Sequence, residues 1–246
     1  MATTFVNQVN FPIATVEHTV AVKPFPELDN NAFVIPELIP AAERETILTA
    51  LAESNWQPVS ITGMSGNWKE GDPIGSYRAS NFTQEYADVL WNRVKDNFPA
   101  KRIFTDADNT DWDGHEIWEP IGFSPLLRFI KYTDGGWLVV HYDAPYVESE
   151  DVRTLQSVVI YLDQTETLQG GATRYMEDPQ AGIPIAERNL NDQTRQATED
   201  EVRLRFSPEH GTAVIFDHRL LHDAELVTGK GNKIIIRTDI LYRKVK

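Results

Sequence analysis

The hydrophobic and polar positions of this chain follow two different patterns, and the change between them falls near residue 125. In the first half, residues 40–51 predict a helix, because proline opens the segment, acidic residues occupy its first turns and apolar residues recur at helical spacing. A second helix is predicted from residue 83 to about residue 98, where apolar residues recur every four positions. A short apolar run at residues 33–35 predicts a strand.

Beyond residue 125 the chain consists of short apolar runs separated by turn residues, which is typical of a β-sandwich or barrel. Residues 133–136 predict a hairpin turn, and residues 104–125 and 177–210 predict loops. No shift in composition divides the chain, so we expect one α+β domain over 1–246, with 1–125 as a helical support region and 126–246 as the β core. Strands are predicted at residues 126–132, 137–142, 155–162, 172–176, 212–217 and 233–242.

The composition excludes several kinds of site. The chain has 246 residues, of which 41% are hydrophobic, so it is long enough to bury a substantial core. It contains no cysteine, which excludes disulfides, thiolate zinc sites, iron–sulfur clusters and cysteine nucleophiles. The G-x-G-x-x-G, G-x-x-x-x-G-K-[ST] and G-x-S-x-G motifs are missing, which argues against dinucleotide sites, P-loops and nucleophile elbows.

Charge and hydropathy also limit the partners and the location. A net charge of −14 disfavours binding to nucleic acid and to anionic membrane surfaces. No stretch approaches the ~18 apolar residues of a membrane span, and residues 1–20 lack the pattern of a signal peptide. We therefore expect a cytoplasmic protein without a membrane or nucleic-acid partner. The sequence leaves its oligomeric state open, and a homodimer is one alternative.

The most informative chemistry lies at His141 and Asp143, which are two residues apart in a predicted strand and therefore project from the same face. An imidazole and a carboxylate so placed offer two adjacent ligands to a metal ion, and His222, which follows a later strand, is the best third donor. Two histidines and one carboxylate form the facial triad of non-haem Fe(II) oxygenases. The simpler alternative is that His141 and Asp143 form a surface pair and bind no metal. His218 has H-x-x-x-H spacing with His222, but we interpret it as a structural or supporting residue.

With these residues identified, residues 126–242 resemble the Fe(II)/2-oxoglutarate-dependent oxygenase superfamily, and in particular its prolyl-4-hydroxylase-like branch. Asp163 replaces the Asn that is usual in the family, and residues 33–56 resemble the entry strand and helix of that branch less distinctively. The family's landmarks occur in its usual order at residues 128–132, 135–136, 141–143, 153–163, 170–173, 211–216, His222, 231–233 and Arg237.

The resemblance implies a double-stranded β-helix, or jelly-roll, with the N-terminal helices packed on one sheet. It implies that His141, Asp143 and His222 bind Fe(II) as the catalytic centre, with 2-oxoglutarate as cosubstrate and O₂ as oxidant. It also implies decarboxylation of 2-oxoglutarate to succinate and CO₂, coupled to oxidation of a C–H bond. Halogenases of this superfamily carry a small residue in place of Asp143, so the aspartate argues for hydroxylation, desaturation or ring closure.

The remote carboxylate of the cosubstrate requires a cation, and two candidates share one face of the last predicted strand. We favour Arg237 over Lys233, because Arg237 lies deeper in an apolar run and its planar fork pairs with a carboxylate bidentately. Ion pairing of Arg237 with Asp239 is the alternative. Tyr132 and Tyr161 match positions where relatives place hydroxyls on the cosubstrate, and satisfied core tyrosines are their alternative reading.

For the substrate we expect a small molecule, such as an amino acid or a natural-product intermediate, with a peptide or protein substrate left open. The loop at residues 177–210 is a candidate lid. Two other functions also stay open: a jelly-roll metal hydrolase or isomerase that does not use 2-oxoglutarate, and a catalytically silent binding domain. The candidate substrate-binding residues are Arg78, Trp112, Trp118, Arg128 and Arg153.

Overall fold

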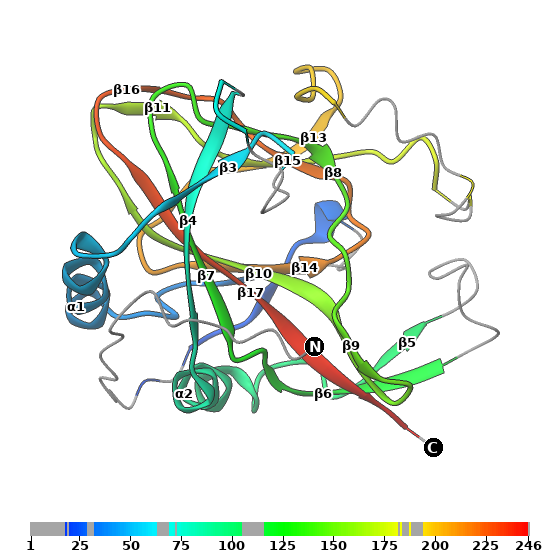
Figure 1. The fold of residues 1–246 in the computed structure, drawn as a ribbon. Coiled ribbons are helices and arrows are strands. Elements are labelled where there is room, and N and C mark those ends of the chain that lie inside the picture. Colours follow the sequence, from blue (N-terminus) through cyan, green and yellow to red (C-terminus); the bar gives the residue numbers. More distant parts are fainter. Residues whose placement is uncertain are drawn as a thin grey trace.

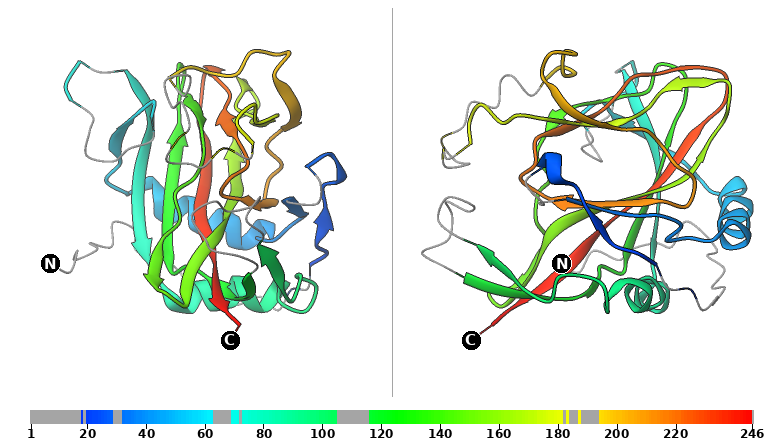
Figure 2. Two further views of the ribbon diagram at one scale, coloured as in Figure 1. Left: turned by 90° about the vertical axis from the view of Figure 1, so that its right-hand side faces the viewer. Right: turned by 180° about the vertical axis from the view of Figure 1, so that it is seen from behind.

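The computed structural model describes residues 18, 20–28, 32–62, 69–71, 73–104, 116–181, 183, 187 and 194–245. Two sheets face each other, and the helices cover the outer side of the larger one (Figures 1 and 2). The predicted jelly-roll fold is thereby confirmed. Trp112 and most of residues 1–31 lie outside the described residues.

The larger sheet, called here the long sheet, has the strand order β1-β2-β14-β10-β17-β7-β4-β3. The strand β6 also pairs with β17 and with β5, and β9 pairs with β10. Its strands are β1 (Lys23–Pro24), β2 (Ala32–Ile35), β3 (Gln57–Ser60), β4 (Ile74–Phe82), β5 (Arg102–Phe104), β6 (Glu116–Phe123), β7 (Leu126–Tyr132), β9 (Val147–Ser149), β10 (Val152–Gln164), β14 (Ala213–Asp217) and β17 (Lys233–Lys244).

The smaller sheet, called here the short sheet, has the order β13-β12-β15-β8. Its strands are β8 (Leu138–His141), β12 (Thr173–Met176), β13 (Val202–Phe206) and β15 (His222–Ala224). A separate pair, β11 (Leu168–Gly170) with β16 (Val227–Gly229), lies beside the two sheets at their top in Figure 1.

The two predicted helices are confirmed as α1 (Ala41–Ala52) and α2 (Gln84–Val94), and a short 3₁₀ helix, η1 (Pro26–Leu28), precedes them. The Thr83 side chain caps α2 by accepting a hydrogen bond from the Tyr86 backbone N–H over 3.3 Å. A buried ion pair joins the helices, because Arg93 Nη2 on α2 lies 2.6 Å from Glu43 Oε2 on α1. The Tyr86 hydroxyl donates to the same carboxylate, so the charge of Glu43 is fully paired inside the core.

Two hydrophobic clusters hold the layers together, and the long strands alternate between them. On β10, Val158 and Ile160 pack with the helices in an outer core, whereas Val159 and Tyr161 face the short sheet in an inner core. A strand buried on both faces reads as a continuous apolar run, which is why residues 155–162 predicted a strand so clearly. The same alternation on β17 turns its polar side chains toward the space between the sheets.

Several predictions fail where pairing partners are distant in sequence. Residues 133–136 form a turn, with Gly136 N–H donating to Thr133 O, but β7 and β8 belong to opposite sheets and form no hairpin. Residues 116–123 of the predicted loop form β6, and β13 lies within the predicted loop 177–210. The strand predicted at residues 33–35 is confirmed as β2, but β4 and β6 were not predicted, and they also join the long sheet, so the region 1–125 contributes strands as well as helices.

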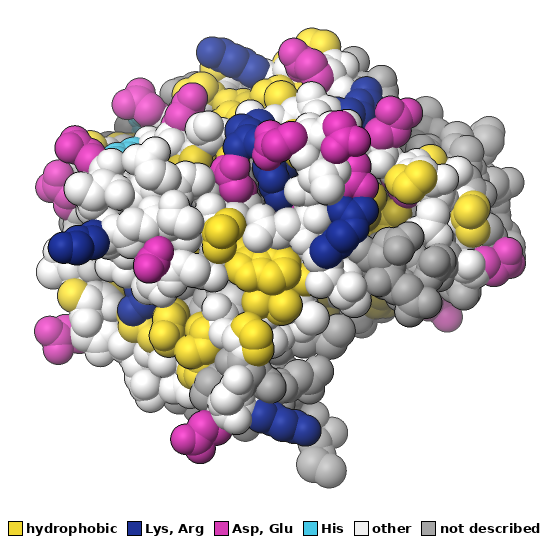
Figure 3. Space-filling view, turned by 90° about the horizontal axis from the view of Figure 1, so that it is seen from above, with side chains coloured by type: hydrophobic (Ala, Val, Ile, Leu, Met, Phe, Trp, Pro, Cys, Tyr) yellow, Lys and Arg dark blue, Asp and Glu magenta, His cyan; other side chains and the backbone are white. Residues whose placement is uncertain are grey.

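On the face seen from above in Figure 3, basic and acidic side chains lie next to each other and form no continuous basic surface among the residues drawn in colour. Among the described residues, ion pairs such as Arg195–Glu201 and Arg205–Glu199 also join basic and acidic side chains. None of the described helices is long and apolar enough to cross a membrane.

Candidate metal centre

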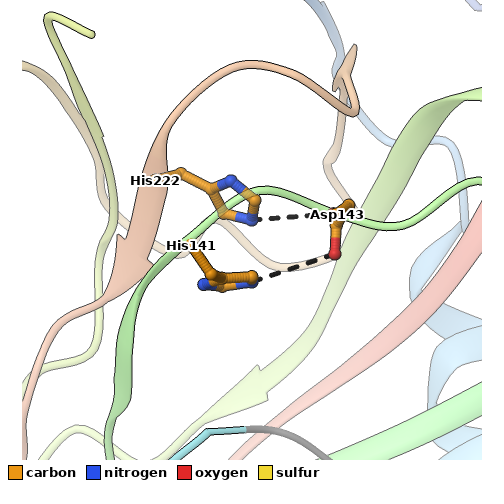
Figure 4. A group of neighbouring side chains, drawn as sticks. All are labelled: His141, Asp143 and His222. Atoms are coloured by element: carbon orange, nitrogen blue, oxygen red, sulfur yellow. Dashed lines mark ion pairs between the residues drawn. The ribbon is translucent and has the colours of Figure 1, made fainter. Parts of the chain in front are cut away.

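Strand pairing brings two distant histidines together. His141 ends β8, His222 begins β15, and the antiparallel ladder places these residues directly opposite each other. Their ring centroids are 4.2 Å apart. Asp143 follows two residues after His141, and its carboxylate turns back toward both rings (Figure 4). Each of the three residues offers a ligand atom, and these atoms lie within 4.8 Å of one another.

In each imidazole a hydrogen bond holds Nδ1 and leaves Nε2 directed at the centre of the site. The Nδ1 atom of His141 lies 2.7 Å from Val139 O, and the Nδ1 atom of His222 lies 2.8 Å from Leu220 O. A carbonyl oxygen only accepts, so both Nδ1 atoms carry the proton and both Nε2 lone pairs point at the centre. Burial lowers the pKa of His222 to about 3, with a further contribution from His141, which keeps this imidazole neutral.

The carboxylate of Asp143 is held in its ionised form. Burial alone would raise its pKa, but the Arg237 guanidinium, with the neighbouring imidazoles, holds the pKa well below its ordinary value. Arg237 Nη2 lies 3.0 Å from Asp143 Oδ2, and the Ser157 hydroxyl donates to the same oxygen. The Asp143 backbone N–H donates to His218 O over 2.9 Å, which fixes the chain at this point.

A buried polar network supports this carboxylate from behind. Because the Ser157 hydroxyl hydrogen is directed to Asp143, the proton in the 2.9 Å contact between His218 Nδ1 and Ser157 Oγ belongs to the imidazole. His218 Nε2 then accepts from the Thr154 hydroxyl over 3.1 Å. Burial lowers the pKa of His218, which keeps it neutral. The interpretation of His218 as a supporting residue therefore agrees with its contacts, and its Nε2 is turned away from the three ligands.

A cavity of about 670 Å³ opens beside these ligands, between the two sheets. The long sheet lines it with residues from β4, β7, β10, β14 and β17, and residues 141–146 with β15 line the other side. Val159, Ile235 and Phe216 give it apolar wall surface. Such a combination of apolar walls and a few polar groups is the usual form of a small-molecule site.

Lys233 lines this cavity as a buried cation. Its side chain is only 1% exposed, and its Nζ donates to Gly171 O over 2.5 Å. The ammonium lies over the ring of Tyr132, 4.9 Å from its centroid, and over that of Tyr161 at 5.6 Å. Burial lowers its pKa to about 7 against the weaker opposing effect of Glu225, whose carboxylate pairs with Arg205. A buried ammonium without a counter-ion is a natural partner for an anionic ligand.

The double glycine before β12 makes room for this lysine. Gly170 has φ +76°, and a Cβ there would lie 2.1 Å from Leu226 O. Gly171 has φ +80°, and a Cβ there would lie 3.1 Å from Lys233 Cδ. Only glycine adopts these positive φ angles freely, so Gly171 allows the backbone to approach Lys233 closely and Gly170 allows it to approach Leu226.

Arg237, the cation that the sequence favours, is engaged by the protein itself. Its Nη1 pairs with Asp239, its Nη2 contacts Asp143 and Ser157, and these carboxylates raise its pKa although burial opposes them. The alternative of an ion pair with Asp239 is therefore what the structure contains. Of the two tyrosines, Tyr132 lines the cavity, whereas the Tyr161 hydroxyl is 2.6 Å from Thr173 Oγ1 in the buried interior.

The candidate substrate-binding residues separate into two groups. Arg78 and Arg128 line the cavity. Trp118 is 0% exposed in the outer core, and Arg153 lies over its ring at 5.0 Å, so this pair is built into the scaffold away from the cavity. The structure places neither residue in the cavity wall, because β6 buries Trp118 in the outer core. Trp112 lies outside the described residues.

Several residues of the site escaped the sequence analysis, and the most important is Ser157, whose hydroxyl donates to Asp143. Ser157, Val159 and Tyr161 alternate on β10, so the period of two already places the serine on the inner face. Thr173 and Tyr146 line the cavity. Each is an ordinary strand or loop residue by sequence, and only the contact with Asp143 or the cavity distinguishes it.

A family model described as the 2OG-Fe(II) oxygenase superfamily matches residues 127–238. No curated protein sequence gives a significant match. Residues 127–238 contain the three candidate ligands, Lys233 and Arg237, and they span β7 to β17.

The chain is also similar to solved structures, at low sequence identity. The viral collagen prolyl hydroxylase of Paramecium bursaria Chlorella virus-1 is 15% identical, with a TM-score of 0.46, over 87% of this chain and 96% of that chain. The prolyl-4-hydroxylase of Pseudomonas putida is 14% identical, with a TM-score of 0.48, over 90% and 98%. HygX from Streptomyces hygroscopicus, solved with nickel and 2-oxoglutarate bound, is 12% identical, with a TM-score of 0.47, over 87% and 82%.

Proposed function

We propose that this chain, which belongs through residues 127–238 to the 2OG-Fe(II) oxygenase superfamily, hydroxylates a C–H bond of a small molecule. The family implies Fe(II) and 2-oxoglutarate as cofactor and cosubstrate. The observation that carries the proposal is the convergence of His141, Asp143 and His222 on one point of the cavity wall.

The donor set fits Fe(II). Two imidazoles and one carboxylate, all on one side of a common point, form a facial triad and leave the opposite positions to other ligands. Each ligand is held by a second contact, the histidines through Nδ1 and the aspartate through Ser157 and Arg237. Such outer contacts orient ligands and keep them in the binding form.

The cavity fits 2-oxoglutarate as well. We assign the remote carboxylate of the cosubstrate to Lys233, because Arg237 is already bound by Asp143 and Asp239. Thr173 and the Tyr132 ring form the wall near the ammonium. When bound, iron and 2-oxoglutarate together supply oxidation of a C–H bond, with succinate and CO₂ as coproducts. The part of the chain is to bind and orient these groups and to exclude water with Val159, Phe216 and Ile235.

Two features support hydroxylation of a small molecule. The third candidate ligand is a carboxylate, whereas halogenases of the superfamily carry a small residue there, so a halide site is not expected. A cavity of about 670 Å³ lies within the range of small-molecule sites. A peptide hydroxylase is the alternative, and substrate length distinguishes the two.

The test is a screen for substrate-stimulated succinate formation by the Fe(II)-loaded protein, with amino acids and short peptides in separate pools. The proposal expects stimulation by a small molecule and a product heavier by one oxygen atom, measured by mass spectrometry. Stimulation by peptides alone would contradict the small-molecule assignment, and turnover without 2-oxoglutarate would contradict the oxygenase assignment.

A further inference from the structure

Three arginines line one wall of the cavity on three neighbouring strands. Arg78 lies on β4, Arg128 on β7 and Arg237 on β17, and these strands are adjacent in the long sheet. The register places Arg128 directly opposite Arg237, and Arg78 opposite Ile130, which is two residues from Arg128 on the same face. Like charges at neighbouring positions of one sheet face repel each other, so this arrangement has a cost that a purely structural wall would avoid.

The carboxylates of the cavity wall do not balance these guanidiniums. Asp239 is shared, because Arg128 Nη1 lies 3.4 Å from its Oδ2 while Arg237 binds its Oδ1. Asp143 is a candidate metal ligand, and Asp223 is bound by Arg174, whose Nε and Nη2 lie 2.8 and 2.5 Å from its two oxygens. If Fe(II) and 2-oxoglutarate bind as proposed, their charges neutralise each other. Among the described residues of the wall, Lys233 and the three arginines then outnumber the carboxylates of Asp143 and Asp239, which leaves an excess of positive charge.

The pKa values of Arg78 and Arg128 reflect this buried positive charge. Burial lowers the pKa of Arg78 to about 10, and repulsion by Arg128 and Arg237 lowers it further than burial alone. Burial and Arg237 likewise lower the pKa of Arg128 against the opposing effect of Asp239. A bound anion between the two guanidiniums would reverse both shifts.

We infer that the substrate is an organic acid whose carboxylate binds between Arg78 and Arg128. This inference rests on the proposed function, because it concerns the substrate of the same site. Arg237 is excluded as the anchor, since Asp143 and Asp239 already hold it. The planar fork of arginine binds a carboxylate bidentately, and Ile130, on β7 opposite Arg78, gives apolar contact for the carbon chain.

One further lining residue suits such a substrate. Tyr146 belongs to the segment between Asp143 and β9, and it is 57% exposed although it lines the cavity. Its backbone is fixed, because its N–H donates to Thr154 Oγ1 over 2.8 Å and its carbonyl accepts from Thr154 N–H over 2.9 Å. A ring on a fixed backbone at the cavity wall offers the substrate an apolar surface that becomes buried only on binding.

The test uses ¹⁹F NMR on the protein loaded with Mn(II) and 2-oxoglutarate. Two probes have nearly the same shape and differ in charge: 4-fluorobenzoate and 4-fluorobenzamide. The paramagnetic ion accelerates the ¹⁹F relaxation of a probe bound in the cavity. We expect faster relaxation for the benzoate than for the amide. Equal relaxation of the two probes would overturn the inference.

Substitutions of the two arginines test where in the cavity the benzoate binds. Arg78→Met and Arg128→Met should each weaken benzoate binding by about tenfold or more, because each removes a charge-assisted hydrogen bond. Lys131→Met is the matched control, since Lys131 lies on β7 but faces Trp56, 4.5 Å from its ring centroid, outside the cavity. Unchanged benzoate binding in both arginine variants would overturn the inference. If one variant does not fold, the other still decides.

Failure of this inference and failure of the proposed function are distinguishable. The paramagnetic relaxation of water protons by Mn(II), measured with and without 2-oxoglutarate, reports loading of the metal centre. Loading without preferential benzoate binding overturns the carboxylate anchor alone. A protein that binds neither Mn(II) nor 2-oxoglutarate contradicts the proposed function, and with it the inference.

Discussion

His141 and His222 lie directly opposite each other on paired antiparallel strands, with their ring centroids 4.2 Å apart. They are far apart in sequence, and the pairing of β8 with β15 brings the two imidazoles together. Each ring is fixed by a carbonyl two residues before it, which leaves both Nε2 atoms directed toward Asp143. The meeting of the two candidate histidine ligands therefore depends on the register of β8 and β15. Each candidate ligand can be tested by its own substitution.

Asp143→Ala should abolish high-affinity binding of Fe(II) or Mn(II), because it removes the only anionic ligand of the three. Isothermal titration with Mn(II) measures this loss. Asp96→Ala, at an exposed position just after α2, is the matched control and should bind metal like the unmodified protein. Metal affinity that survives in Asp143→Ala would show that the carboxylate is not a ligand.

Ser157→Ala should weaken metal binding by about 10–100-fold without removing a ligand, because Asp143 loses the hydroxyl that orients it. The variant also leaves Arg237 and His218 without one partner, so the free energy of unfolding should fall by about 1–3 kcal/mol. Mn(II) titration and urea denaturation measure the two effects. Ser207→Ala, at an exposed position just after β13, should change neither. A loss of stability with unchanged metal affinity would show that Ser157 is structural only.

Lys233→Met should abolish 2-oxoglutarate binding while metal binding survives. The buried ammonium has no carboxylate partner among the described residues, so the apolar replacement should leave the free energy of unfolding at neutral pH unchanged or higher. Titration of the Mn(II)-loaded variant with 2-oxoglutarate checks the first expectation, and urea denaturation checks the second. Normal 2-oxoglutarate affinity in Lys233→Met, together with its loss in Arg237→Met, would return the assignment to the arginine.

Binding of 2-oxoglutarate should weaken as the pH rises above about 7, because burial lowers the pKa of Lys233 to that value and the neutral amine binds a carboxylate poorly. Binding should therefore be accompanied by proton uptake in this range, which calorimetry in buffers of different ionisation enthalpy measures. An affinity for 2-oxoglutarate that is independent of pH between about 7 and 9 would contradict this role of Lys233.

The same pKa has the opposite effect on the stability of the ligand-free protein. The unfolded chain, with an ordinary lysine pKa of 10.5, binds more protons than the folded protein between about pH 7 and that value. The contribution of Lys233 to the free energy of unfolding therefore rises with pH across this window. Denaturation of the unmodified protein and of Lys233→Met at several pH values isolates this contribution, and identical pH profiles for the two proteins would contradict it.

Much of the fold could be predicted from sequence because its strongest signals are local. The helix α1 and the strands β7 and β10 follow from apolar periodicity over short windows. The strand β6 was missed because it contains Pro120, which the sheet tolerates next to a register shift. The strand β4 was missed because polar residues such as Arg78 face the cavity, and function there disturbs the apolar pattern.

In the candidate site, too, local patterns could be predicted from the sequence, whereas contacts between distant segments could not. The H-x-D spacing and the shared face of Lys233 and Arg237 are local, and the structure agrees with both. Sequence reasoning favoured Arg237 because an unpaired buried charge is costly. The same cost explains why Arg237 has two carboxylate partners, of which Asp143 comes from a distant segment. The choice between the two cations depended on that distant contact, which no local pattern contains.

The most direct test of the central claim is an anaerobic titration of the purified protein with Fe(II) and 2-oxoglutarate, followed by visible absorption. If His141, Asp143 and His222 hold iron beside a pocket for the cosubstrate, a weak charge-transfer band should appear only when both components are present, and Asp143→Ala should lack it. A protein that binds Fe(II) but gives no band with saturating 2-oxoglutarate would contradict the claim.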